Sequence, residues 1–196
     1  MKWITRTQET EVRAVELPED QDNVYIEGYA AVFNVPSLQI YDERFGVFEE
    51  TILPGAFDRT DMSDVKATDN HGKPFARTRN KTLELGIDEK GLYYRAKLSK
   101  ANTRHMDLYD EVRSGLYTGS SFEFIARKGG YTFDRDTRKR VITDLEVVRD
   151  VSPVYDPAYI QATAEARSAF DVEIEEVQKA VESAELRKKL ILKTLT

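Results

Sequence analysis

The chain has 196 residues, of which 40% are hydrophobic and 33% charged, and its formal net charge is −6. This length fits one domain with room for an appendage. The negative balance argues against non-specific nucleic-acid binding, because neutralising phosphates requires a surplus of Lys and Arg. The chain has no cysteine, which excludes disulfides, thiolate zinc sites and thiol nucleophiles.

The hydrophobic residues do not gather into a run that could cross a membrane. Such a span needs roughly 20 consecutive apolar residues. The N-terminus turns polar after Met1-Lys2-Trp3-Ile4, which is unlike a signal peptide. We therefore expect a soluble, intracellular protein without a membrane partner.

Short strands dominate the pattern of the first two-thirds of the chain. Residues 24–32 alternate with a period of two, as expected for a β-strand. The clearest hairpin covers residues 83–98, where two alternating segments flank the turn Asp88-Glu89-Lys90-Gly91. A second hairpin is predicted over residues 131–145. These features favour a mainly β fold.

One helix is predicted between the strands. Met106, Tyr109, Val112 and Leu116 recur at three- and four-residue steps, and Asn102 precedes them as a candidate N-cap. A helix with this spacing presents one apolar face to the β-rich body.

The C-terminal segment differs in composition from the rest. Residues 162–196 contain no Gly or Pro, and their apolar side chains recur at helical spacing. We expect a long amphipathic helix, whose apolar face packs on the body, on a second copy or on a partner. The sequence therefore predicts two parts, a β-domain over residues 1–161 and a helical tail over residues 162–196.

A candidate nucleophile lies in the strand-like segment 119–124. Ser121 and Glu123 share one face of this strand, while Ser120, Phe122 and Phe124 share the other. If the phenylalanines face the core, Ser121 points away from it, toward a cleft or solvent. Ser121 is therefore favoured over Ser120.

A serine needs a general base, and the chain has two histidines. His105 falls at the start of the predicted helix, where a surface or capping role is expected. His71 lies in an irregular Asp-Asn-His-Gly stretch and is the better candidate. Asp150, Glu146 and Asp69 are all candidates for the acid that would orient the imidazole, and residue chemistry alone does not rank them.

Other chemistries have weaker support. The sequence lacks a Walker-type loop, a G-x-G-x-x-G motif after a strand and a His-Glu-x-x-His motif. The acidic stretches lack the spacing of a calcium loop. A carboxylate-pair hydrolase stays open, because Asp and Glu number 35, but no pair stands out.

Six segments together resemble the prohead maturation proteases of tailed phages, a family related in fold to the herpesvirus assemblin proteases. The segments run in the family's order and cover roughly residues 20–165. They are Glu27–Asn34, residues 49–57 with Pro54-Gly55-Ala56-Phe57, Asn70-His71, Gly91–Ala96, Gly119–Phe124, and Asp150–Tyr159.

The resemblance implies a closed, mostly antiparallel β-barrel with flanking helices. It implies an endopeptidase that cleaves scaffold protein, or the scaffolding segment of the major capsid protein, inside the assembling prohead in the host cytoplasm, with self-cleavage as a further activity. Carried onto this chain, the family's catalytic residues fall on Ser121, His71 and Asp150. No metal or cofactor and no specific nucleic acid is implied, and the herpesvirus relatives suggest a homodimer.

The sequence departs from the family pattern at two positions. Asp150 replaces the usual Glu, which shortens the side chain by one methylene. Glu123 stands where the family often has Gly, on the face of Ser121. The oxyanion donors stay unassigned between a backbone N–H near the serine and an arginine such as Arg149.

Two other functions compete with the protease. A catalytically inactive capsid-assembly or scaffolding protein could keep the same fold, and Glu123 beside the serine is the feature that most favours it. A hydrolase of the same fold could instead act on small esters or amides.

Overall fold

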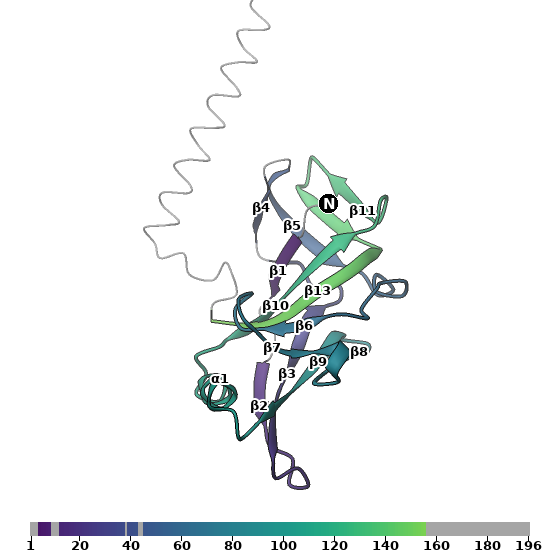
Figure 1. Cartoon of the computed structure of the whole chain (residues 1–196). Helices are drawn as coiled ribbons and strands as arrows, with labels where there is room; N and C mark the ends of the chain where they lie inside the picture. The colour runs from purple at the N-terminus through teal and green to yellow at the C-terminus, as the bar shows by residue number, and fades with distance from the viewer. Residues whose placement is uncertain (1–3, 9–11, 38, 43–44, 156–196) are drawn as a thin grey trace, which may run out of the picture. The chain divides into compact units, whose positions relative to one another are not determined.

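The computed structural model describes residues 4–8, 12–37, 39–42 and 45–155, with only the backbone of residues 4–8. Three sheets form the described part (Figure 1). The first sheet has five strands in the order β1-β10-β13-β6-β7. Its strands are β1 (Ile4–Gln8), β6 (Lys66–Thr68), β7 (Pro74–Arg77), β10 (Gly119–Ala126) and β13 (Leu145–Val154).

The other two sheets have four strands each. The second sheet has the order β2-β3-β9-β8. Its strands are β2 (Val12–Val15), β3 (Asn23–Val32), β8 (Leu83–Ile87) and β9 (Gly91–Ser99). The third sheet has the order β11-β12-β5-β4. Its strands are β4 (Ile40–Asp42), β5 (Gly46–Ile52), β11 (Tyr131–Asp134) and β12 (Lys139–Ile142).

The mainly β prediction is confirmed, but the closed antiparallel barrel is wrong for the residues described. None of the three sheets closes on itself. A barrel closes only when the first and last strands of a sheet pair with each other. Among the described residues the outer strands, β1 and β7, β2 and β8, and β11 and β4, do not pair. Two pairs, β5–β12 and β6–β13, are also parallel.

Both predicted hairpins are present, as β8–β9 and β11–β12. The predicted helix is α1 (Thr103–Arg113), the one α-helix of the described residues, so the expectation of several flanking helices is not met there. Asn102 caps α1 by accepting a hydrogen bond from the Arg104 N–H, as its sequence position indicated. Leu116 lies beyond the end of α1 and is exposed.

One hydrophobic core joins the sheets. It contains buried side chains from β3, β9, β10 and β13 and the inner face of α1, which contacts β2, β3 and β9. Phe122 and Phe124 of β10 are stacked in it. No helix of the described part is long and apolar enough to span a membrane. The predicted tail, residues 162–196, and its boundary with the β-domain lie outside the described residues.

Candidate active site

His71, Ser121 and Asp150 meet at the centre of the five-stranded sheet. The ring nitrogen Nε2 of His71 lies 2.5 Å from Ser121 Oγ. The other ring nitrogen, Nδ1, lies 3.1 Å from Asp150 Oδ1. The imidazole therefore bridges a hydroxyl and a carboxylate that come from different strands.

The pairing of β10 with β13 puts two of these groups on one face. Ser121 is the register partner of Ser152, and Glu123 is the partner of Asp150. Directly opposed residues of an antiparallel pair project to the same side, as do residues two apart along a strand. Ser121, Glu123, Asp150 and Ser152 therefore form one polar patch, and Figure 1 shows β10 and β13 side by side through the body.

The turn between β6 and β7 brings His71 over this patch. Asn70 and His71 both have left-handed backbone conformations, with φ of 45° and 57°. Non-glycine residues adopt this region at a cost, so the surroundings must hold them there. The Gly72 N–H closes the turn on Asp69 O at 2.7 Å, and the Asn70 N–H donates to Pro153 O at 3.2 Å.

Ser152 supplies a direct bond to the backbone of His71. Its Oγ accepts the His71 N–H at 2.9 Å and donates to Thr68 O at 2.6 Å. Ser152 is fully buried. One hydroxyl therefore ties the His71 turn both to β13, on which Ser152 lies, and to the end of β6.

Asp150 is held by a second bond on its other oxygen. Thr68 Oγ1 donates to Asp150 Oδ2 at 3.2 Å, while Oδ1 faces His71. Both Thr68 and Asp150 are buried. A carboxylate fixed in this way keeps the Nδ1–H tautomer of the imidazole, which leaves Nε2 as an acceptor toward Ser121.

The geometry separates the acids that the sequence left unranked. Asp150 is the carboxylate in contact with His71. Asp69 instead accepts a hydrogen bond from Tyr117 Oη. Burial, followed by its bonds to Asp69 and Tyr155, raises the pKa of the Tyr117 hydroxyl, which therefore stays protonated. Glu146 lies four residues before Asp150 on β13, roughly 13 Å along the strand.

The remaining serine and histidine candidates lie elsewhere. Ser120 Oγ is 3.0 Å from Tyr94 Oη on the opposite face of β10. His105 Nδ1 accepts the Ser99 N–H at 3.0 Å, next to the start of α1. Burial, and then the nearby charge of Arg104, lowers the pKa of His105. His105 therefore links the first turn of α1 to the end of β9, whereas the N-cap of α1 is Asn102.

The environment of Ser121 differs from the prediction. Ser121 lies on the expected face of β10, but it was predicted to face a cleft or solvent. Its exposed fraction is 0%. Its neighbours on the patch are more accessible, since the side chains of His71 and Glu123 are 19% and 17% exposed. The sequence could not show this, because the covering turn comes from a distant segment.

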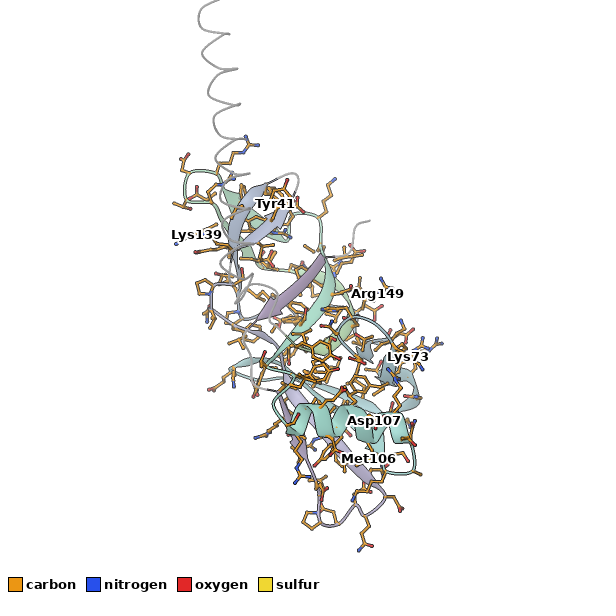
Figure 2. The ribbon with its side chains drawn as sticks, turned by 90° about the vertical axis from the view of Figure 1, so that its left-hand side faces the viewer. Tyr41, Lys73, Met106, Asp107, Lys139 and Arg149 are labelled. Atoms are coloured by element: carbon orange, nitrogen blue, oxygen red, sulfur yellow. The ribbon has the colours of Figure 1, made fainter. Side chains whose placement is uncertain are left out.

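Glu123 has a cationic neighbour at the outer edge of the patch. Arg149 Nη1 lies 3.5 Å from Glu123 Oε2. Figure 2 shows Arg149 at the outside of the body, on the same side of the view as Lys73, which follows the His71 turn. His71, Glu123 and Asp150 each offer one potential metal-ligating atom, and these atoms lie within 4.8 Å of one another.

Thr68 and Ser152 are site residues that were not predicted from the sequence. Ser152 could have been found, because residues 150 and 152 share one face of a strand, so a site at Asp150 includes Ser152. Thr68 has no such signal, since its place beside Asp150 depends on the parallel pairing of β6 with β13.

A hydroxyl, an imidazole and a carboxylate joined in this order are the parts of a serine hydrolase. A sequence profile of the Caudovirus prohead serine protease family matches residues 8–179. The chain therefore belongs to this family, which confirms the resemblance drawn from the sequence motifs.

A relative from a known phage agrees with the family assignment. The prohead protease of Enterobacteria phage HK97 is 28% identical to the chain over 174 residues, which cover 87% of this chain and 72% of the relative. No solved structure is significantly similar.

Proposed function

We propose that the chain is an endopeptidase that trims scaffold protein, or the scaffolding segment of the major capsid protein, inside the assembling prohead in the host cytoplasm. Ser121 would be the nucleophile, His71 the general base and Asp150 the acid that orients it. The observation that carries this proposal is the contact of His71 Nε2 with Ser121 Oγ at 2.5 Å, with Asp150 on the other ring nitrogen.

The proposed reaction is acyl transfer in two steps. His71 Nε2 takes the proton of Ser121 as Oγ attacks the scissile carbonyl carbon, and the imidazolium then gives that proton to the leaving amine. The C–N bond breaks and an acyl-serine ester forms. Water, deprotonated by His71, attacks this ester, and the imidazolium returns the proton to Ser121 Oγ as the C–Oγ bond breaks and the new carboxyl end is released. Asp150 stays ionised and stabilises the imidazolium throughout.

The exposed edge of the patch indicates how a peptide would approach. Ser121 itself is buried, so a scissile bond has to reach it past the partly exposed side chains of His71 and Glu123. Glu123 and Arg149 would then flank the incoming peptide.

We also propose that residues 162–196 form a helical tail separate from the β-domain of residues 1–161. The support is compositional, an amphipathic pattern free of Gly and Pro. Such a tail would dock on scaffold by helix-in-groove or coiled-coil packing, and self-cleavage would remove it.

Co-expression with the scaffold and capsid proteins of the same genome tests the proposal. Wild type, Ser121→Ala and Ser120→Ala are compared by the intact mass of every chain. We expect wild type and Ser120→Ala to trim a partner chain, and Ser121→Ala to leave every chain whole. Equal masses in all three, with assembly intact, would overturn the protease proposal in favour of an assembly role.

A further inference from the structure

Two carboxylates face each other on the patch. Glu123 and Asp150 are register partners across β10 and β13, so their side chains project to the same side at the distance of a cross-strand pair. Like charges in this arrangement repel. Asp150 is buried, which strengthens its field, while Glu123 reaches the surface and contacts Arg149. The pair therefore forms a locally negative position that favours a cation.

His71 adds a nitrogen ligand to the two carboxylates. Its Nδ1 and Asp150 Oδ1 are 3.1 Å apart. One ring nitrogen of His71 and one oxygen of each carboxylate lie within 4.8 Å of one another. Zinc bound at its usual distances in a tetrahedral site separates neighbouring ligand atoms by roughly 3.3 Å. Two of the ligands therefore already stand at the required spacing. Glu123, with three rotatable side-chain bonds, has to close the remaining gap.

The ligand types select among metals. An imidazole ligand favours zinc, copper, iron or nickel over magnesium and calcium, which prefer oxygen alone. Of these, zinc takes imidazole and carboxylate ligands together in four-coordinate sites. Three protein ligands leave the fourth tetrahedral position to water. Arg149 opposes a cation here, but its side chain is 49% exposed, so it can turn from Glu123 toward solvent.

We propose that His71, Glu123 and Asp150 form a Zn²⁺ site that reversibly blocks the serine. Zinc bonded to Nδ1 uses the lone pair left when that nitrogen loses its proton. The proton moves to Nε2, so the imidazole stays neutral and no proton is released overall. Nε2 then donates toward Ser121 Oγ and no longer accepts from it. This blocking step rests on the proposed function, because it removes the general base that activates Ser121.

Zinc binding is measured first, independently of catalysis. Calorimetric titration with zinc chloride uses the full chain carrying Ser121→Ala, so that self-cleavage is excluded. This background is compared with the same chain carrying Glu123→Gln or Glu146→Gln. Glu146→Gln is the matched control, since it removes one charge from the same strand as Asp150, roughly 13 Å away.

We expect zinc binding in the background and in the Glu146→Gln chain, and binding at least about tenfold weaker in the Glu123→Gln chain. ¹⁵N spectra of the imidazoles should show the proton of His71 moving from Nδ1 to Nε2 as zinc is added. Equal binding by the Glu123→Gln and Glu146→Gln chains would overturn the site. Zinc binding without a tautomer change would overturn the blocking step.

The rate at which a fluorophosphonate labels Ser121 tests the block in chains that keep this serine. Zinc should slow labelling of wild type and Glu146→Gln, and a chelator should restore it. For Glu123→Gln, about tenfold more zinc should be needed to slow labelling by the same fraction of that variant's zinc-free rate. Undiminished labelling of zinc-bound wild type would overturn the block. If no chain is labelled without zinc while binding still depends on Glu123, the proposed protease chemistry fails and the metal site stands.

Discussion

Ser121 and Ser152 lie directly opposite each other on β10 and β13, and both bond to His71. Ser121 Oγ meets the ring at Nε2, and Ser152 Oγ accepts the backbone N–H of the same residue. One position in the β10–β13 register therefore determines where the proposed nucleophile stands and where the backbone of its base is held. This makes Ser152 a positioning residue for the proposed reaction.

Replacing Ser152 with Ala should lower kcat for peptide cleavage by about 10- to 100-fold with little change in KM. The hydroxyl holds a turn in which His71 is left-handed, and losing it leaves the His71 N–H and Thr68 O without this partner. Small misplacements of a catalytic group cost up to about 10² in rate. Steady-state kinetics on a peptide cut from the natural substrate provide the measurement.

Ser120→Ala is the matched control for this change. It also deletes a buried serine hydroxyl, but one bonded to Tyr94 on the far face of β10. It should cost about 1–3 kcal/mol of unfolding free energy, because the Tyr94 hydroxyl loses a partner, while kcat stays near wild type. Equal kcat losses in both variants would mean that Ser152 acts only through stability.

Replacing Asp150 with Asn should lower kcat by about 10⁴. An amide can donate a hydrogen bond to Nδ1, which would favour the Nε2–H tautomer and prevent His71 from accepting the Ser121 proton. The rate of Ser121 labelling by a fluorophosphonate, which depends on the same activation by His71, should fall with kcat and provides the measurement. Glu146→Gln, on the same strand, should label at the wild-type rate, and a similar loss in that variant would contradict the assignment.

The sequence predicted those parts of the fold and site that depend on local spacing. The hairpins, α1 and the face of β10 that carries Ser121 all follow from periods of two or of three to four residues. The family motifs pointed to His71, Ser121 and Asp150 together, and the structure places these residues in contact.

The features that were missed depend on pairings between distant segments. Thr68 reaches Asp150 because β6 pairs with β13 in parallel, across 82 residues of sequence. Ser121 is covered because a turn 50 residues earlier lies over it. The sheets are open because the two outer strands of each sheet do not pair with each other in the described part of the chain. Periodicity specifies faces within a strand but not the neighbour that the strand takes.

The row Arg13–Glu27–Arg95 across β2, β3 and β9 should make the fold sensitive to acid. Burial opposes ionisation of Glu27, but bonds from Arg95, Tyr93 and Arg13 outweigh it and lower the pKa. Because the pKa of Glu27 is lower in the folded chain, its ionised form stabilises the fold at pH values above its unfolded pKa, near 4.5. This stabilisation is lost as the pH falls through the folded pKa.

Glu27→Gln should therefore be less stable than wild type at pH 7, by about 1–3 kcal/mol, and this gap should shrink below about pH 4.5. Urea unfolding across pH 3 to 7 measures it. Glu84 is exposed and lies opposite Arg95 on the edge strand β8, so Glu84→Gln should change stability by less than about 0.5 kcal/mol. A gap between wild type and Glu27→Gln that is independent of pH would contradict the ionic role of Glu27.

Gly91→Ala should destabilise the fold by about 3 kcal/mol, because the added methyl has no space. A Cβ at Gly91 would lie 1.9 Å from the carbonyl oxygen of Ala31, beside the register shift in β3, so backbone has to move. Thermal unfolding should show a Tm lower by about 6–12 °C. Gly86→Ala, on the neighbouring strand β8, meets its nearest atom at 3.9 Å and should stay within about 1 kcal/mol of wild type. Equal Tm values for the two variants would show that β3 and β9 are further apart at this position than the structure places them.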